Sequence, residues 1–245
     1  MACKIIFTAG AKGGTGKSTF LRFPITWLHD AGIDPYLIDA DEESRTLSRF
    51  FPNALGVEPR RTKSYDVIVN LAETGEHPLI IVDLKAGVGN DMLNWIADVP
   101  FDELAEIGVT MLCIGVITSS PDSISSLLRW VDFLGKQVEW LVVKNLKDSD
   151  ATGLDPASVS FPDYDLTKAA LEFRKRYKPA EIIMPGLDPE YQCELEKYNL
   201  TIRDVLARRP GLPELLAPLM VRSKLRNYQA ALFAQLDEIK ELLLP

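Results

Sequence analysis

The sequence predicts an α/β protein built on a mostly parallel, twisted sheet with helices on both faces, a three-layer sandwich. Short apolar runs recur along the chain, and segments with helical spacing lie between them. Such runs are typical of strands buried on both faces, and their alternation with helices is typical of parallel sheets. The 245 residues are 47% hydrophobic and 25% charged, an ordinary globular composition. Because no internal repeat or low-complexity linker interrupts the pattern, we expect residues 1–245 to form a single domain.

Six segments have the features of buried strands. Each is rich in apolar residues, many of them β-branched or aromatic, and is bounded by turn residues. The predicted strands are 4–9, 35–40, the part of 77–87 that ends at Asp83, 109–118, 138–145 and 180–185. In a parallel sheet the carboxyl ends of the strands meet at one edge, and we expect ligands to bind there.

Three segments have the apolar spacing of longer helices. The predicted helices are about 17–32, 121–135 and 219–243, the last of them amphipathic. Residues 64–73 fit either a strand or the start of a helix, within a stretch, 42–76, that the pattern leaves unassigned. Residues 146–165 are rich in Asp, Ser and Pro, so we expect a loop there.

The charge and cysteine content argue against several classes of protein. A formal net charge of −8 at pH 7 argues against a protein coated in nucleic acid, although a local basic patch is compatible with it. The three cysteines, Cys3, Cys113 and Cys193, are far apart and include no CxxC pair, which indicates a reducing compartment and no disulfide framework or zinc site. The sequence has no signal peptide pattern and no apolar run of the roughly 20 residues that span a membrane. We therefore expect a cytoplasmic protein.

The segment TAGAKGGTGKSTF, residues 8–20, joins the first predicted strand to the first predicted helix. In a phosphate-binding loop (P-loop), backbone N–H groups and the helix N-terminus face the phosphates, and a lysine neutralises the β and γ groups. Lys17 has the position of that lysine, and Ser18 would place its hydroxyl on Mg²⁺. Ala11 stands where the standard spacing has its first glycine. A tight turn would explain the glycines but not Lys17, Ser18 or the additional Lys12, so the segment predicts a nucleotide site.

The stretch KGGTGKST, residues 12–19, resembles the deviant Walker A box of the ParA/MinD ATPases, KGGxGK[ST]. This resemblance implies an ATPase that uses ATP and Mg²⁺ and forms a homodimer when ATP is bound. In that dimer Lys12 reaches the partner's nucleotide, where a second cation would stabilise the transition state as an arginine finger does, while Lys17 acts in its own site. The alternative is that Lys12 is a solvated loop lysine. The candidate nucleotide contacts in the loop are Lys12, Gly13, Gly14, Thr15, Gly16, Lys17, Ser18 and Thr19.

Two aspartates, Asp39 and Asp41, follow the second predicted strand in the segment DADEES. They resemble the first switch of the family, DxDPQ, but the sequence departs from it after the second aspartate. The resemblance implies that Asp41 positions the attacking water and that Asp39 supports the Mg²⁺ hydration shell, so both are candidate catalytic residues together with Lys12. The alternative is that the pair caps the turn after the strand.

Asp83 closes the apolar run LIIVD and resembles the Walker B aspartate of the family, in a D-x-x-x-G pattern that ends at Gly87. A carboxylate there can hold Mg²⁺ directly or through water. The candidate metal residues are therefore Ser18, Asp39 and Asp83.

Two residues at later strand ends resemble the base contacts of the family. Asn145 ends the fifth predicted strand and would contact adenine, since an asparagine amide can bond the edge of a base. Pro185 follows the sixth predicted strand and would flank the ring. The alternative for Asn145 is an ordinary turn residue.

Basic residues are in local excess near the C-terminus, where residues 200–245 contain seven Lys or Arg and five acidic residues. Basic residues on one face would bind DNA phosphates with strong salt dependence, although a solvated helix face has the same composition. The candidate DNA contacts are Arg203, Arg208, Arg209, Arg222, Lys224 and Arg226. The sequence thus favours a ParA-like ATPase whose ATP-dependent dimer binds DNA non-specifically. It would act in plasmid or DNA partition, or in a related DNA-transfer or positioning process, with a stimulating partner protein.

Two other functions share the phosphate loop. A MinD-like ATPase would position a cellular assembly or act at a membrane surface, but Asp237, Glu238 and Glu241 make the last helix unsuited to anionic lipid. A P-loop metabolic enzyme would use ATP on a small substrate, and a metal-cluster carrier would hold its cluster with paired cysteines. Cys113 and Cys193 have no matching spacing for such a cluster.

Overall fold

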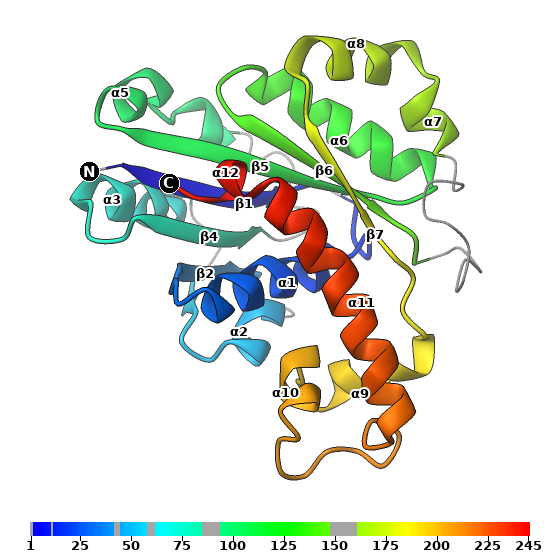
Figure 1. Ribbon diagram of the computed structural model, residues 1–245. Helices are drawn as coiled ribbons and strands as arrows, with labels where there is room; N and C mark the ends of the chain where they lie inside the picture. Colours follow the sequence, from blue (N-terminus) through cyan, green and yellow to red (C-terminus); the bar gives the residue numbers. More distant parts are fainter. Residues whose placement is uncertain (1, 11, 42–44, 58–61, 85–93, 148–160) are drawn as a thin grey trace.

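The computed structural model describes residues 2–10, 12–41, 45–57, 62–84, 94–147 and 161–245. The strands in these ranges form one seven-stranded parallel sheet with the order β3-β2-β4-β1-β5-β6-β7 (Figure 1). They are β1 (Cys3–Ala9), β2 (Tyr36–Ala40), β3 (Leu55–Gly56), β4 (Leu79–Leu84), β5 (Val109–Ile117), β6 (Glu139–Asn145) and β7 (Ala180–Met184). The predicted α/β class is confirmed, and so are the six predicted strands. The sequence did not predict β3, because two exposed residues at the edge of a sheet have no apolar run that would indicate a strand.

The helices divide between the two faces of this sheet. They are α1 (Lys17–Asp30), α2 (Thr46–Phe50), the 3-10 helix η1 (Thr62–Tyr65), α3 (Asp66–Thr74), α5 (Phe101–Glu106), α6 (Pro121–Leu134), α7 (Pro162–Asp165), α8 (Lys168–Tyr177), α9 (Pro189–Lys197), α10 (Ile202–Leu206), α11 (Leu219–Glu238) and α12 (Lys240–Leu243). The ambiguous segment 64–73 is therefore helical.

Two expectations about the helices are wrong. Within the expected loop 146–165, residues 162–165 form α7, because Pro162 at the start of the turn presets a helical φ. The segment 219–243 is not one helix. The chain leaves helical geometry at Ile239, with φ −110° and ψ 17°, and α12 then buries Leu243.

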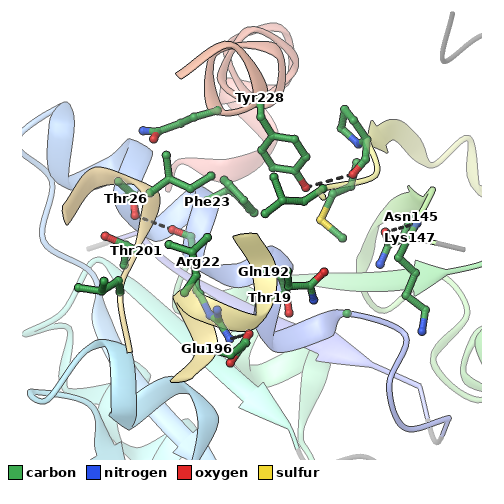
Figure 2. A pocket seen from close by; sticks show the side chains of 18 of the residues that line it. Thr19, Arg22, Phe23, Thr26, Asn145, Lys147, Gln192, Glu196, Thr201 and Tyr228 are labelled. Carbon is green, nitrogen blue, oxygen red and sulfur yellow. Dashed lines mark hydrogen bonds and ion pairs between the residues drawn. The ribbon is translucent and has the colours of Figure 1, made fainter. Parts of the chain in front are cut away.

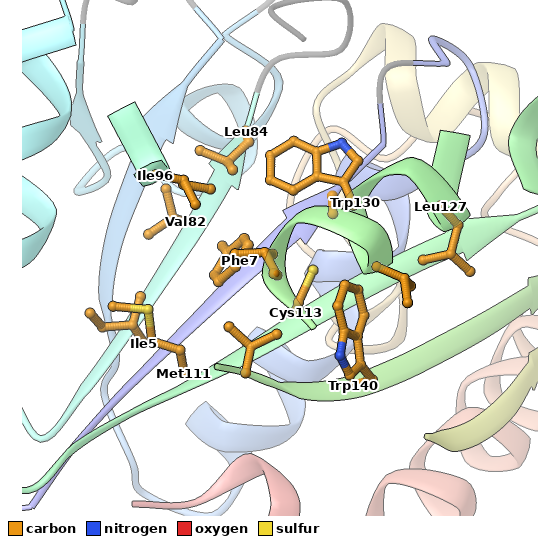
Figure 3. Close-up of a cluster of buried hydrophobic side chains, with 14 of the residues drawn as sticks. Ile5, Phe7, Val82, Leu84, Ile96, Met111, Cys113, Leu127, Trp130 and Trp140 are labelled. Atoms are coloured by element: carbon orange, nitrogen blue, oxygen red, sulfur yellow. The ribbon is translucent and has the colours of Figure 1, made fainter. Parts of the chain in front are cut away.

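One face of the sheet is covered by α3, α5, α6, α7 and α8, whose apolar residues form a single buried cluster with the strands (Figure 1). Figure 3 shows part of this cluster, in which Phe7 of β1 and Cys113 of β5 lie near Trp130 of α6. The ring centroids of Phe7 and Trp130 are 6.5 Å apart. Helix α6 packs closely because Gly115 of β5 has no Cβ, which would lie 2.4 Å from a methyl carbon of Leu127.

The opposite layer contains α1, α2, α9, α10, α11 and α12. Helix α11 crosses this layer, and its lower end in Figure 1 lies beside α9 and α10. Leu225, Leu232 and Leu236 of α11 are fully buried in the second cluster. No helix in the described part of the chain is both long and apolar enough to span a bilayer.

The sheet order places a crevice at the carboxyl end of β1. This strand lies between β4 and β5 and leads to α1 on one face, whereas β5 leads to α6 on the other face. Neighbouring strands that lead to opposite faces leave a crevice beyond their carboxyl ends. Asp39 and Asp83 are register partners on β2 and β4, so both carboxylates lie at this edge.

Candidate nucleotide-binding site

The phosphate loop turns from β1 into α1 at the carboxyl edge of the sheet. Gly14 and Gly16 have φ values of 71° and 96°, which favour glycine, and Gly16 is the residue before the helix. Lys17 is buried, and its Nζ donates to the Lys12 carbonyl at 3.0 Å. Burial lowers the pKa of Lys17, whereas Asp83 and Asp41 raise it. An ammonium has three donors, so this buried cation can also bind phosphate oxygens beside the helix N-terminus.

Asp83 lies beneath the loop and accepts hydrogen bonds from the hydroxyls of Ser18 and Thr8, the latter at 3.3 Å. Burial raises the pKa of Asp83 to about 6, against the opposing effects of Ser18 and Lys17. The other carboxylate oxygen, Oδ2, is buried and has no hydrogen-bond partner among the described residues. A buried carboxylate with an unpartnered oxygen next to a serine hydroxyl fits Mg²⁺ or its coordinated water. The donor set therefore suits the predicted Mg²⁺–ATP.

Asp39 organises the chain that follows β2. Its Oδ1 accepts from the Asp41 backbone N–H at 3.0 Å, and its Oδ2 accepts from the Ser48 N–H at 2.8 Å and the Ser48 hydroxyl at 2.7 Å. Asp39 thereby ties α2 to the sheet edge. Asp41 is half-buried and near enough to Lys17 to affect its pKa. The roles of Asp39 in the Mg²⁺ shell and of Asp41 at the attacking water stay predictions.

Lys12 lies at the same edge of the sheet, and its side chain forms an ion pair within its own chain. Its Nζ is 3.0 Å from Oδ2 of Asp122 in α6, with 47% and 72% of the two side chains exposed. Its backbone N–H donates to the Ser126 hydroxyl at 3.4 Å. Exposed ion pairs of this kind contribute little free energy, so the Lys12 side chain can leave Asp122 for another anion.

A cavity of about 220 Å³ opens beside the loop and extends between α1, α9, α10 and α11 (Figure 2). Its lining includes both predicted base contacts, Asn145 and Pro185, together with Gly16 and Thr19. The Pro185 carbonyl accepts a hydrogen bond from the Tyr228 hydroxyl at 3.1 Å, which fixes this wall. The cavity is adjacent to the phosphate loop, as a base pocket must be.

Several residues at the site were not predicted. Thr8 precedes the loop and donates a hydrogen bond to Asp83, and Arg22 and Glu196 form a partly buried ion pair of 2.7 Å in the cavity wall. An arginine in the apolar stretch FLRF is a signal that could have drawn attention to Arg22. Nothing in the sequence connects it to Glu196, which is 174 residues away.

The predicted DNA contacts lie on α10, α11 and the turn after α10. Arg203 pairs with Asp30 at 3.2 Å and Arg209 pairs with Asp204 at 3.7 Å. Arg222 is half-buried, and the remaining candidates are exposed, namely Arg208, Lys224 and Arg226. The structure brings these residues to one region, because α10 packs against α11, and their binding of DNA stays a prediction.

The cysteines do not form a cluster site. Cys3 and Cys113 are buried in the sheet, and Cys193 is exposed on α9. Gly87, the end of the predicted Walker B pattern, lies outside the described residues.

No protein-family model and no curated protein matches the sequence. Among solved structures, the MinC:MinD cell division protein complex of Aquifex aeolicus is similar, with a TM-score of 0.52 and 16% identity over 95% of this chain and 96% of that chain. The MinD cell division protein of Aquifex aeolicus is also similar, with a TM-score of 0.50 and 15% identity over 95% of this chain and 98% of that chain. With its parallel sheet and its phosphate loop at the carboxyl edge, this chain has a MinD-like P-loop fold.

Proposed function

We propose that this protein is a ParA-like ATPase of the cytoplasm that hydrolyses ATP with Mg²⁺ and binds DNA as an ATP-dependent homodimer. The observation that carries the proposal is the meeting of Lys17, Ser18 and Asp83 at the carboxyl edge, where Asp83 keeps a buried oxygen without a described partner. A buried cation beside a helix N-terminus suits phosphate, and the neighbouring carboxylate suits its magnesium.

In the proposed hydrolysis, some of these residues bind the phosphates, one orients the attacking water and one stabilises the transition state. Bound Mg²⁺–ATP supplies the phosphoryl group that is transferred to water. The loop N–H groups and Lys17 hold the phosphates, and Asp41 orients the attacking water. Lys12 leaves Asp122 and enters the site of a second copy, where it stabilises charge in the transition state.

The experiment that tests this arrangement mixes two inactive variants, Lys12→Ala and Asp41→Ala. In a mixed dimer, the site built on the Lys12→Ala chain keeps its own Asp41 and receives Lys12 from the other chain. Mixing should restore ATPase activity to at most about a quarter of the wild-type rate, since half of the dimers are mixed and one of their two sites is complete. Each variant alone is the control.

If Lys12 acted within its own chain, both sites of the mixed dimer would lack a residue, and no activity would return. Full activity in either single variant would remove that residue from the mechanism. A wild-type chain that neither binds nor hydrolyses ATP would overturn the ATPase itself.

The DNA part of the proposal is supported by the exposed basic residues Arg208, Lys224 and Arg226 on a chain that is acidic overall. Retardation of random-sequence DNA should require ATP and Mg²⁺ and should weaken steeply as salt rises. Absence of binding at low salt with ATP and Mg²⁺ present would contradict it. A partner protein that stimulates hydrolysis belongs to the same proposal.

A second candidate is a MinD-like ATPase that positions a cellular assembly or acts at a membrane surface, and it is supported by the two similar structures described above, both of which contain MinD. Liposome co-sedimentation distinguishes the two. ATP-dependent sedimentation with anionic vesicles would favour the MinD-like function, and DNA retardation without sedimentation would favour the ParA-like one.

A further inference from the structure

Both polar atoms of the Asn145 side-chain amide are hydrogen-bonded to the backbone of the protein. Its Nδ2 donates to the Thr15 carbonyl at 2.8 Å in a buried hydrogen bond, and its Oδ1 accepts from the Lys147 backbone N–H at 3.0 Å. Asn145 is only 4% exposed. One N–H and one oxygen lone pair of the amide remain, but at this low exposure the amide presents little polar surface to a base in the cavity.

The same amide lies directly over the last turn of the phosphate loop. A Cβ on Gly16 would come within 2.4 Å of Asn145 Nδ2 and 3.3 Å of Met184 Cε, so glycine is required for this close approach. Gly16 has φ 96°, and Lys17 begins α1 immediately after it. The orientation of the Thr15–Gly16 peptide thus depends on the end of β6.

The end of β6 is in turn held by its neighbours. The Leu146 N–H donates to the Met184 carbonyl at 2.9 Å, beyond the last β6–β7 pair, Asn145 and Met184. Asn145 therefore connects a rigid part of the sheet to the loop that carries the phosphate-binding N–H groups and Lys17.

We propose that Asn145 is a positioning residue of the phosphate loop and does not read the base. This inference rests on the nucleotide binding proposed above, and it changes the role that family resemblance implies for this residue. The asparagine fixes the Thr15 carbonyl and so the direction of the N–H groups that follow. Base recognition belongs to other residues of the cavity.

The test compares the binding of ADP, GDP and inorganic pyrophosphate, each with Mg²⁺, by titration calorimetry. Asn145→Ala removes the amide. Asn145→Asp keeps the shape and the acceptor for Lys147 but loses the donor to Thr15. The matched control is Asn70→Asp, the same chemical change on the exposed face of α3.

Asn145→Ala should weaken all three ligands by a common factor, about tenfold for the loss of one buried hydrogen bond. Asn145→Asp should weaken them further, because it also places a negative charge beside the phosphate loop. The ratio of ADP to GDP affinity should stay at the wild-type value, and Asn70→Asp should bind like wild type. Thermal unfolding of the ligand-free variants separates this effect from a general loss of structure, which would lower the midpoint.

Loss of ADP affinity with pyrophosphate affinity retained, or a changed ratio of ADP to GDP affinity, would show that Asn145 reads the base and would overturn the inference. Wild-type affinity for all three ligands in both variants would overturn it too. If the wild-type protein bound none of the three, the proposed nucleotide site would fail first, and this inference would fail with it.

Discussion

At the scale of single residues, the Asp83 carboxylate lies in an unfavourable electrostatic environment. Its carboxyl is buried under the loop, one oxygen lacks a described partner, and burial raises its pKa to about 6. Lys17, also buried, offsets only part of this cost. A site that holds a desolvated carboxylate is prepared for a cation, and it is less stable without one.

We predict that Asp83→Asn stabilises the ligand-free protein at pH 7.5 in EDTA. Because the folded pKa is raised above the unfolded one, the folded state binds more protons between about pH 4 and 6, and wild-type stability falls as pH rises through that window. Asn does not ionise, so the stability of the variant does not fall with pH in this way. At pH 7.5 its free energy of unfolding, measured with urea, should exceed that of wild type by roughly 1–3 kcal/mol. The gain should shrink towards pH 4.

The same variant should lose the stabilisation that Mg²⁺–ADP confers on wild type. Asp98→Asn, which replaces an exposed carboxylate, serves as the control. It should change neither the free energy of unfolding of the ligand-free protein nor its stabilisation by Mg²⁺–ADP. A variant less stable than wild type at pH 7.5 would mean that Asp83 is a structural acceptor for Ser18 and Thr8 rather than a cation ligand.

Lys12 provides a second prediction at this scale. Because the Lys12–Asp122 pair is exposed, Asp122→Asn should change the free energy of unfolding by less than about 0.5 kcal/mol. Urea unfolding of the ligand-free protein measures this. A loss well above about 1 kcal/mol would show that the lysine is held firmly in its own chain, contrary to the role proposed for it.

At the scale of elements, a network of contacts made by Arg22, Arg49 and Glu196 connects α1, α2 and α9. Arg22 of α1 pairs with Glu196 of α9 and stacks over the Phe50 ring of α2, 3.4 Å from its centroid. Arg49 of α2 donates to the Glu196 carbonyl at 2.8 Å and, through Nε, to Asn199 at 2.9 Å. Since Asp39 also holds α2 through Ser48, α2 is tied both to the sheet edge and to the end of α9.

We predict that Glu196→Ala destabilises the protein by roughly 2–3 kcal/mol in urea unfolding, because it leaves the Arg22 guanidinium buried without its carboxylate. The loss stays below that of a fully buried pair, since the Glu196 side chain is 32% exposed. Glu190→Ala, an exposed position on the same helix, should change stability by less than about 0.5 kcal/mol. Equal effects of the two changes on the free energy of unfolding would show that the Arg22–Glu196 pair does not stabilise the protein.

At the scale of the whole molecule, the net charge of −8 repels DNA, so any binding must come from a local surface. The exposed Arg208 follows α10, and the exposed Arg226 lies on α11, which packs against α10. Replacing both with alanine removes four cations from the proposed ATP-bound dimer and should lower the slope of log affinity against log salt by about 4. Lys168→Ala, an exposed change on α8, is the control and should keep the wild-type slope. An unchanged slope in the double variant would place the DNA surface elsewhere.

The phosphate loop and its neighbours could be predicted because their chemistry is local. Lys17 and Ser18 follow the glycines within one turn, and parallel strands bring Asp39 and Asp83 to the same edge. Helix α1 could be predicted despite Pro24, which interrupts backbone hydrogen bonding, because Phe20, Leu21, Ile25 and Leu28 recur near helical spacing, and all four are buried. Short elements such as β3 and α2 could not, because too few residues repeat in them to form a pattern.

The sequence alone determined the parallel α/β fold, the phosphate loop and the carboxylates beside it, since each depends on residues close in the chain or on the geometry common to parallel strands. The tertiary structure decided how those residues are held. It placed the Asn145 amide on the Thr15 carbonyl, 130 residues away, and Glu196 on Arg22. Such pairs form only when distant segments pack together, and no periodicity along the chain records which side chains will then meet.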